Sequence, residues 1–391
     1  MIPALLSNYA PADLSFEKGE GAYLYGNDGR RYLDFAAGIA VSGLGHAHPA
    51  LVAAITDQAS KVWHVSNLFR IPGQEVLAQK LVNATFADAV YFCNSGAEAN
   101  ECAIKMVRKY FSHIGEPEKY RIIAFENSFH GRTLATIAAA GQDKLLAGFG
   151  PAMDGFDHVA VGYIDLVEAA ITDETAAILI EPIMGEGGIR VVEPSFLRAL
   201  RDLCDERGLL LVFDEIQTGM GRTGKLFAYE HAAMVPDIMT SAKALGGGFP
   251  VGACLAVEKV AVAMTVGSHG STYGGNPLAM AVAGAVVETI TAEGFLDHVV
   301  EMGNHLKQGL EGVIDRHPDI LEELRGVGLH LGLKCKIENK QLFNALLKQG
   351  VLTVMGGDNV VRLLPPLIIE DAQISELVSA LDDVCTELEN A

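Results

Sequence analysis

The chain of 391 residues is half hydrophobic and strongly acidic, with 49 Asp and Glu residues against 29 Lys and Arg residues. This length accommodates two or three domains and a large core. The formal net charge of −20 argues against nucleic acid or anionic membrane surfaces as partners, because both require clustered positive charge.

The cysteines and the N-terminus bear on the cellular compartment. None of the six cysteines forms a CxxC pair, and all stand in apolar surroundings, so we expect reduced thiols in a cytoplasmic protein. The first residues lack the basic and apolar regions of a secretory signal. No apolar run approaches the ~20 residues that a membrane-spanning helix requires.

Residues 1–50 are predicted to form the N-terminal part of a small domain. Residues 21–25 and 31–35 alternate like strands around the turn at 26–29, which is a hairpin signal. A glycine-rich corner follows with His46 and His48. We interpret both histidines as turn residues and expect no metal site, because no third ligand is nearby.

Residues 51–285 are predicted to form a large α/β domain. Helical patterns run from Pro49 to about Ser60 and from about Gln74 to Thr85. Strand patterns then alternate with helical ones such as 97–110 and 194–207; the strands are expected at 89–93, 121–125, 159–161, 176–180, 209–213 and 237–240. This alternation predicts a mostly parallel sheet with helices on both faces.

The last part of the chain is predicted to leave this sheet. Residues 253–257 are expected to double back as a strand, and a long helix begins near Pro277. Residues 286–391 are expected to form a smaller α+β domain together with the N-terminal segment. Its predicted helices are 295–317, 340–349 and 370–389, and its predicted strands are 328–333 and 360–364.

The central stretch of the chain runs from Leu209 to Lys243. A buried strand ends at Asp214 and Glu215, and the next strand delivers Lys243, so both side chains are expected at the carboxyl edge of the sheet, where open α/β sheets bind ligands. Pyridoxal phosphate chemistry requires this pair: the amine bonds covalently to the cofactor aldehyde, and the carboxylate keeps the pyridine nitrogen protonated. Taken singly, an Asp such as Asp214 is more often a helix cap, and a Lys such as Lys243 is more often a surface amine.

Further motifs supply groups that suit such a cofactor. Ser95, Gly96 and Ala97 stand between a strand and a helix, which makes either a phosphate site or an ordinary N-cap. Gln217 is a candidate donor to the ring oxygen, and Ser271 and Thr272 offer two hydroxyls before a helix. The glycines at 246–248 do not fit GxGxxG, so a dinucleotide site is poorly supported.

Three side chains are candidates for contact with the cofactor ring and the substrate. Phe129 is able to lie against an aromatic ring, and the planar fork of Arg132 suits a carboxylate. Alone, they are more typical of a loop aromatic packed on the core and a solvated arginine. Glu186 lies in a glycine-rich loop after a strand, which indicates a substrate-facing position.

These motifs together resemble the class III pyridoxal-phosphate aminotransferases. The resemblance rests on SGAEAN at 95–100, FHGRT at 129–133, DEIQTGMGRTG at 214–224, SAKALGGGFPVGA at 241–253 and STYGGNP at 271–277. It covers nearly the whole chain, including VRLLPPLII at 361–369. It implies a fold-type I enzyme that transfers the ω-amine of N2-acetyl-L-ornithine to 2-oxoglutarate, giving N-acetylglutamate 5-semialdehyde and L-glutamate in arginine biosynthesis.

The resemblance also implies roles for individual residues. Lys243 would hold the cofactor and carry the proton, Asp214 would pair with the pyridine nitrogen, and Gln217 would approach the ring oxygen. The expected cofactor contacts are completed by Ser95, Gly96, Ala97, Phe129, Glu215 and Ile216. Thr272 would reach the phosphate of the neighbouring subunit, which implies a homodimer with shared active sites.

Substrate contacts follow from the same resemblance. Arg132 would bind the substrate carboxylate far from the transferred amine, Ser271 would lie beside the substrate, and Arg362 would bind the α-carboxylate of glutamate. Glu186 would pair with Arg362 when the amino donor has no carboxylate there. The sequence departs from the family pattern at Arg70, in a segment expected near the substrate entrance. This departure bears on which acyl group the substrate carries and leaves the cofactor chemistry unchanged.

Several alternatives keep the cofactor and change the substrate. N-succinyldiaminopimelate, ornithine and 4-aminobutyrate are the amines of the related ω-aminotransferases. A non-catalytic scaffold of the same fold is a further alternative, although it would have no need for Lys243, Asp214, Gln217 and Arg132 together. A nicotinamide oxidoreductase is the weakest alternative.

Overall fold

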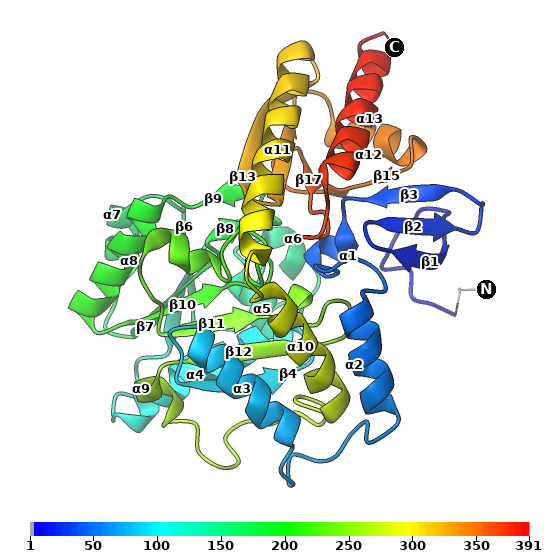
Figure 1. Cartoon of the computed structure of the whole chain (residues 1–391). Coiled ribbons are helices and arrows are strands. Elements are labelled where there is room, and N and C mark those ends of the chain that lie inside the picture. Colours follow the sequence, from blue (N-terminus) through cyan, green and yellow to red (C-terminus); the bar gives the residue numbers. More distant parts are fainter. Residues whose placement is uncertain (1–3, 391) are drawn as a thin grey trace.

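The computed structural model describes residues 4–390 and has the predicted α/β architecture (Figure 1). Its central sheet has the strand order β4-β12-β11-β10-β7-β5-β6. The strands are β4 (Ala89–Cys93), β5 (Arg121–Phe125), β6 (Phe156–Val159), β7 (Thr175–Ile180), β10 (Leu210–Asp214), β11 (Ile238–Ser241) and β12 (Gly252–Ala256). Only β12 runs antiparallel to its neighbours, which confirms that the chain doubles back there.

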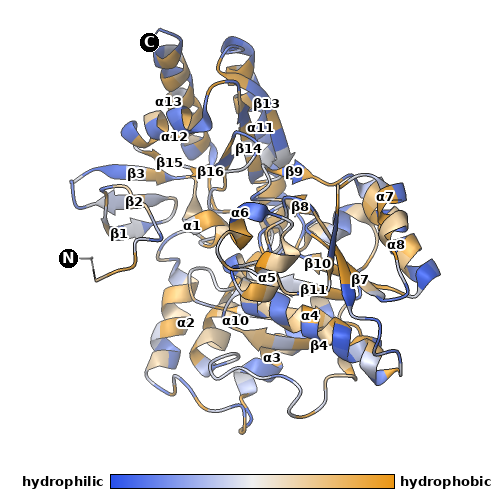
Figure 2. Ribbon diagram, turned by 180° about the vertical axis from the view of Figure 1, so that it is seen from behind, coloured by the Kyte–Doolittle hydropathy of each residue, from blue (hydrophilic) through white to orange (hydrophobic). Residues whose placement is uncertain are grey.

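Helices cover both faces of this sheet because its strands are apolar on both sides. Leu210 and Val212 of β10 belong to one buried cluster, whereas Leu211 and Phe213 belong to another. The helices of this part are α2 (Pro49–Ala59), α3 (Pro72–Ala84), α4 (Gly96–His113), α5 (Leu134–Ala139), α6 (Asp143–Leu146), α7 (Ile164–Ala170), α8 (Pro194–Arg207), α9 (Glu258–Ala261) and α10 (Pro277–Ile290). Figure 2 shows mainly hydrophobic residues at the centre and hydrophilic residues on the outer turns of α7 and α8.

The two ends of the chain meet in a smaller unit. Strands β1 (Phe16–Glu20), β2 (Tyr23–Gly26) and β3 (Arg31–Asp34) form a meander, and β3 pairs in parallel with β15 (Val351–Leu352). In Figure 1 this N-terminal sheet lies beside the C-terminal helices. The predicted hairpin at 21–35 is therefore confirmed, and it is joined to residues more than 300 positions away by the β3–β15 pairing.

A second four-stranded sheet completes this unit, in the order β13-β14-β17-β16. Its strands are β13 (Leu321–Val327), β14 (His330–Cys335), β16 (Val354–Met355) and β17 (Val360–Leu363), and its helices are α11 (Phe295–Arg316), α12 (Asn339–Lys348) and α13 (Asp371–Glu389). The remaining elements are short: α1 (Ala37–Ala40), β8 (Ile183–Met184), β9 (Arg190–Val191), and the 3-10 turns Ala228–Ala232 and Lys243–Leu245.

Two strand predictions were incomplete because polar residues conceal the pattern. Strand β13 was not predicted, since its central residues are charged and partly exposed; it is fixed by pairing with β14. Strand β6 begins at Phe156 rather than at Val159, and its Asp157 accepts two hydrogen bonds from Arg121 on β5, at 2.9 and 2.7 Å. Cross-strand partners, rather than local hydrophobicity, define both strands.

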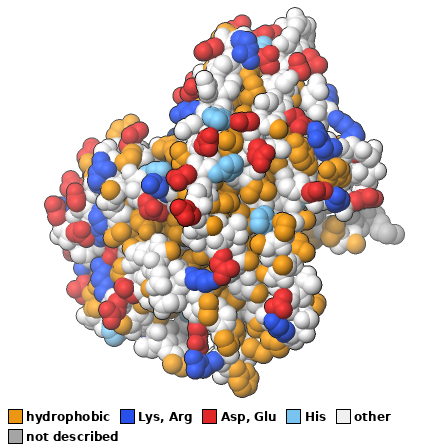
Figure 3. Space-filling view, in the orientation of Figure 1, with side chains coloured by type: hydrophobic (Ala, Val, Ile, Leu, Met, Phe, Trp, Pro, Cys, Tyr) orange, Lys and Arg blue, Asp and Glu red, His pale blue; other side chains and the backbone are white. Residues whose placement is uncertain are grey.

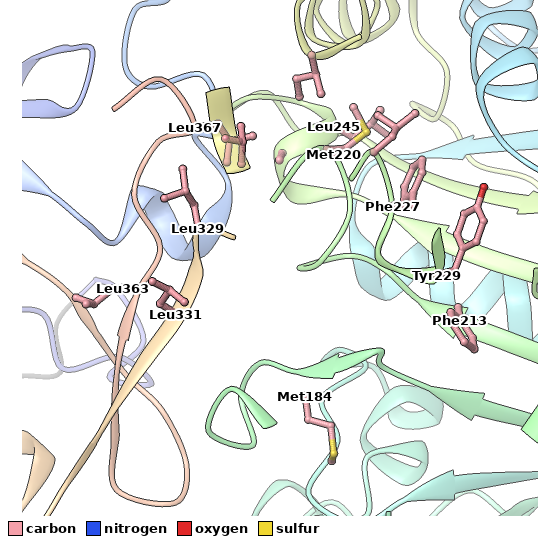
Figure 4. Close-up of a cluster of buried hydrophobic side chains, with 14 of the residues drawn as sticks. Met184, Phe213, Met220, Phe227, Tyr229, Leu245, Leu329, Leu331, Leu363 and Leu367 are labelled. Carbon is pink, nitrogen blue, oxygen red and sulfur yellow. The ribbon is translucent and has the colours of Figure 1, made fainter. Parts of the chain in front are cut away.

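The core is continuous between the two units. Figure 4 shows Leu329, Leu331, Leu363 and Leu367 on one side and Met220, Leu245 and Phe227 on the other, and all belong to one buried cluster. This packing fixes the loops of the small unit over the carboxyl edge of the central sheet.

Three remaining expectations concern cysteines, membranes and metals. The six cysteines are all buried and free, as expected. Among residues 4–390 no single helix is long and apolar enough to cross a membrane; only α10 and α11 taken together reach that length, across a 70° bend. In the same residues no group of three or more His, Cys, Asp and Glu side chains is arranged to hold a metal ion, and His46 bonds Asp34 at 2.7 Å.

Candidate active site

The structure brings Asp214 and Lys243 to one cavity. Strands β10 and β11 are parallel neighbours, with Asp214 paired to Thr240, so both side chains emerge at the same edge. The cavity has a volume of about 450 Å³ and is lined by most of the predicted residues, namely Ser95, Gly96, Ala97, Phe129, Arg132, Glu186, Asp214, Ile216, Gln217 and Lys243.

Lys243 stands at the start of the 3-10 turn that follows β11. Its backbone φ of 45° is uncommon for a residue with a side chain, and such strain is frequent at functional sites. Burial lowers the pKa of the amine below its ordinary value, and Arg362 lowers it further, against the opposing effect of Glu186. A lowered pKa favours the neutral amine, which is the nucleophilic form.

Asp214 is buried and fixed by three donors. Its Oδ2 atom lies 2.8 Å from His130 Nδ1 and accepts a hydrogen bond of 2.7 Å from Asn100 Nδ2, and its Oδ1 accepts from Ile216 N at 3.1 Å. Asn100 is itself held by the Thr240 hydroxyl at 2.9 Å. The carboxylate therefore has a single orientation at the wall of the cavity.

Sequence analysis assigned no role to Asn100 and His130, although both lie within the quoted motifs. Burial opposes a charge on His130, but the hydrogen bond with Asp214 and the charges of Asp214 and Glu181 together outweigh it, so the pKa of the imidazole is raised. An Asn within a helix could have indicated a buried polar contact, because a buried amide must find hydrogen-bond partners. Which residues those partners are depends on how the strands and helices pack against one another.

The N-terminus of α4 forms one end of the cavity. Ser95 is the N-cap, and its Oγ accepts from Glu98 N at 3.2 Å. A Cβ atom at Gly96 would lie 2.8 Å from Ile216 Cδ1, so the chain closes around the cavity where a side chain would not fit. This long helix directs its free N–H groups and the positive end of its dipole toward the cavity, which suits an anion.

Phe129 and Arg132 also line the cavity, on the loop that packs beside the N-terminus of α4. The Phe129 N–H donates to Glu181 Oε1 at 2.8 Å, and the Arg132 guanidinium carbon lies 5.3 Å from the centre of the Phe129 ring. Glu181 is buried, and burial raises its pKa to about 7. The backbone of Phe129 is thus held in place, and the exposed Arg132 is part of the cavity lining.

Glu186 and Arg362 meet across the two units of the fold. Arg362 Nη1 donates to Glu186 Oε1 at 2.6 Å, and Nη2 donates to Met355 O at 3.0 Å. Glu186 lines the cavity, whereas the Arg362 side chain is only 1% exposed. The carboxylate therefore stands between the arginine and the cavity.

Arg362 lies outside the lining of this cavity, and so do four other residues singled out from the sequence. The Glu215 side chain turns away and accepts from Thr218 Oγ1, Ala228 N and Tyr229 N, so it supports the following loop instead of facing the cavity. Ser271 bonds Asn94, which does line the cavity, at 3.2 Å. Thr272 is exposed. Arg70 pairs with Glu75 at 2.8 and 2.7 Å on the surface.

Comparison with known proteins identifies the family to which this chain belongs. Residues 6–385 match the aminotransferase class III family. The chain belongs to the class III aminotransferases. These enzymes use pyridoxal phosphate, so the predicted cofactor and enzyme class are confirmed.

Individual members of the class are similar over nearly the whole chain. Acetylornithine aminotransferase of Mesorhizobium japonicum is 58% identical over 97% of this chain and 95% of its own length. The succinylornithine transaminase/acetylornithine aminotransferase of Pseudomonas aeruginosa is 48% identical over 95% and 92%. Ornithine aminotransferase of Toxoplasma gondii, solved with PLP at partial occupancy, superposes with a TM-score of 0.94 at 31% identity, over 99% and 93%.

The residues of the cavity fit the cofactor of this class. A buried carboxylate, Asp214, lines the cavity and would stabilise a protonated pyridine nitrogen. The cradle at Gly96, which a Cβ would obstruct, lies at a helix N-terminus suited to a phosphate. Lys243, with its lowered pKa, would supply the amine.

Proposed function

We propose that this chain is an acetylornithine aminotransferase, which moves the ω-amine of N2-acetyl-L-ornithine to 2-oxoglutarate and releases N-acetylglutamate 5-semialdehyde and L-glutamate. The observation that carries the proposal is the convergence of Asp214, Lys243 and Arg132 on one cavity. The substrate follows from the 58% identical relative of that name. When bound, pyridoxal phosphate supplies an electron sink for the pair released at the substrate carbon.

The cofactor-binding residues follow from the geometry of the cavity. Ser95, Gly96 and Ala97 would hold the phosphate at the N-terminus of α4, with Ile216 beneath Gly96. Asp214 would keep a proton on the pyridine nitrogen, and its network with His130 and Asn100 would hold it there. Phe129 would lie along the ring, and Gln217 would donate to the ring oxygen.

Lys243 would carry the proton that the reaction moves. Once the substrate amine has replaced it, Lys243 Nζ is a free base in a largely buried position, with a pKa lowered by burial. A base with a pKa closer to neutral both accepts and returns a proton efficiently. It would therefore take the proton from the substrate carbon that bears the amine and deliver it to the former aldehyde carbon of the cofactor, on the other side of that nitrogen.

The cavity would accept two different substrates through one movable ion pair. In the first half-reaction the N-acetylornithine carboxylate would bind Arg132, while the Glu186–Arg362 pair stays closed. In the second half-reaction, the α-carboxylate of 2-oxoglutarate would form an ion pair with Arg362, and Glu186 would rotate out of its contact with Arg362. When the amino donor has no carboxylate near Arg362, the closed pair neutralises the buried charge of Arg362, which would otherwise be unpaired.

The active form is proposed to be a cytoplasmic homodimer. Large apolar side chains are exposed around α2, α3 and the loop before α10, namely Trp63, Leu68, Phe69, Val76 and Tyr273, and Figure 3 shows hydrophobic side chains between charged pairs over this face. Exposed patches of this kind are typical of protein interfaces. Thr272, exposed beside Tyr273, would reach the phosphate of the partner subunit. The free thiols support a reducing compartment.

The domain division is proposed as predicted: 1–50 and 286–391 for the small domain and 51–285 for the large one. The β3–β15 pairing supports joining the two termini. Ser271 is proposed beside the substrate through its bond to Asn94. Glu215 is better placed as a support for the loop that carries Gln217 than as a direct cofactor contact.

A single-turnover comparison of amines tests the function. Holoenzyme is mixed with N-acetylornithine, N-succinyldiaminopimelate, N-succinylornithine, ornithine or 4-aminobutyrate, and loss of the cofactor's visible absorbance is followed. We expect the fastest reaction with N-acetylornithine and one at least tenfold slower with ornithine. A faster reaction with another amine would assign that substrate instead. Purified protein that gains no visible absorbance with pyridoxal phosphate would contradict the function altogether.

A further inference from the structure

His330, on strand β14 of the small domain, contacts Gln217 at the wall of the cavity. His330 Nε2 lies 3.0 Å from Gln217 Oε1, and the imidazole is completely buried. The two residues are 113 positions apart. No motif of the sequence pointed to His330, and none of the steps described above uses it.

The protonation of this histidine follows from its surroundings. Burial lowers the pKa of His330 well below its ordinary value, and the charges of Arg222, Arg362 and Lys243 lower it further. The ring is therefore neutral and carries one proton. The buried Nδ1 has no hydrogen-bond partner in the described chain, and a lone pair tolerates this better than an N–H group, so the proton lies on Nε2. The Gln217 atom that faces Nε2 at 3.0 Å must then be the acceptor of the amide, its Oε1.

This arrangement determines which end of the Gln217 amide faces the cavity. With Oε1 held by His330, the NH2 group is the end left for the cavity, which Gln217 lines. Gly185 leaves the space for this orientation, because a Cβ there would lie 2.0 Å from Gln217 Oε1. An amide without such a partner would be free to turn its carbonyl inward.

The turn that carries His330 is rigidly attached to the large domain. Arg222 Nη1 donates to Leu329 O, and Leu329 N donates to Arg222 O, both at 3.1 Å. Gly328, with a φ of +59°, approaches the Thr223 backbone so closely that a Cβ would lie 2.6 Å away. The imidazole therefore cannot shift without disturbing this contact between the domains.

We propose that His330 is a positioning residue that holds the Gln217 amide with its NH2 group toward the cofactor ring oxygen. The inference rests on the proposed function, since it requires the ring oxygen at that place. A donor stabilises negative charge on the ring oxygen and thereby lowers the pKa of the nitrogen that joins Lys243 to the cofactor. The other groups that act on Lys243 are Glu186, Arg362, Asp214 and Glu181, and the substitutions below leave all four in place.

The test is the pH midpoint at which the visible absorbance of substrate-free holoenzyme changes. We expect His330→Leu to raise this midpoint by about one pH unit, a tenfold change in the proton dissociation constant. His330→Gln, which restores an N–H donor, should return at least half of the shift. In a Gln217→Ala background, His330→Leu should add nothing further, because the residue acts through Gln217.

The outcomes distinguish a failure of this inference from a failure of the proposed function. An unchanged midpoint in His330→Leu, or the same additional shift in the Gln217→Ala background, would overturn the inference. A midpoint raised equally by Leu and by Gln would also overturn it, because packing rather than the proton would be responsible. If His330→Leu fails to fold, His330→Phe and His330→Gln give the same comparison. Wild-type protein without a visible band would instead contradict the proposed function.

Discussion

The guanidinium of Arg362 and the carboxylate of Glu186 form an ion pair, with Nη1 2.6 Å from Oε1, between strand β17 and the turn that joins β8 and β9. Residues 176 positions apart are joined, and the pair closes the cavity from the side of the small domain. This contact makes the difference between the two half-reactions testable.

Glu186→Ala should separate the half-reactions. Arg362 would then face every substrate as an unpaired charge, so the half-reaction with N-acetylornithine should slow by roughly tenfold to a hundredfold, equivalent to a charged hydrogen bond of about 1.5–3 kcal/mol. The glutamate half-reaction should change less than threefold. Single-turnover kinetics with each amine measures both rates, with Glu168→Ala on exposed α7 as the control. Equal slowing of both half-reactions would refute the gating role.

Asp214→Asn should lower kcat by a factor of about 10² to 10³, which corresponds to roughly 3–4 kcal/mol, the order expected for removing one charge of a buried pair. The amide keeps the shape of the side chain but no longer stabilises a positive charge on the pyridine nitrogen. Steady-state kinetics with saturating cofactor measures the effect. Asp205→Asn is the matched control, because Asp205 pairs with Arg201 at the surface. A kcat within threefold of wild type would exclude the assigned role of Asp214.

Gly252→Ala should weaken cofactor binding by about tenfold, or roughly 1.4 kcal/mol. A Cβ there would lie 2.4 Å from Ser95 O and 2.8 Å from Cys93 Sγ, so the loop at the N-terminus of α4 must move. Equilibrium titration of apoprotein with pyridoxal phosphate measures the affinity. In the control Gly312→Ala, the nearest atom is the flexible end of Arg316 at 3.5 Å, and the affinity should not change. An unchanged affinity in Gly252→Ala would show that the loop does not hold the phosphate.

Glu215 makes the stability of the apoprotein dependent on pH. Burial raises the pKa of its carboxyl group to about 7, above the ordinary value near 4.5. Between these pH values the unfolded chain releases the proton while the folded chain keeps it. Stability is therefore lost as pH rises through this window, by roughly 3 kcal/mol at most.

Glu215→Gln lacks this titration and provides the comparison. Free energies of unfolding in urea are measured at pH 5 and pH 8 for both proteins. On going from pH 5 to pH 8, the free energy of unfolding of wild type should fall by roughly 3 kcal/mol relative to that of the variant. Effects of other titrating groups cancel in this difference. A difference that stays constant would mean that Glu215 has an ordinary pKa.

A shared active site predicts complementation between two inactive variants. Lys243→Ala removes the amine, and Thr272→Asp places a negative charge where the partner's phosphate is proposed to bind. A heterodimer of the two has one site with both changes and one site with neither. We expect about half of the wild-type activity per dimer, against near-complete loss in each parent homodimer. Inactive purified heterodimers would contradict the exchange of Thr272 between subunits.

The sequence alone determined the features that depend on a single strand and its neighbour. The apolar runs of β10 and β11, followed directly by Asp214 and Lys243, placed both residues at one sheet edge, because parallel strands emerge on the same side. The glycines and the N-cap at Ser95 predicted the helix that faces the cavity. The family and its cofactor were predicted from five sequence motifs, among them those that contain Ser95, Asp214 and Lys243, which occur in the order typical of that family.

Only the tertiary structure decided which distant polar groups meet. The contacts of Asn100 with Asp214 and of His330 with Gln217 join positions more than 100 residues apart. The orientation of Glu215 away from the cavity, and of Arg362 behind Glu186, was equally hidden. Local propensity fixes where a strand ends, but a buried polar side chain must find its partner on whichever element packs against it. That choice is made where α4 and the smaller unit pack against the central sheet.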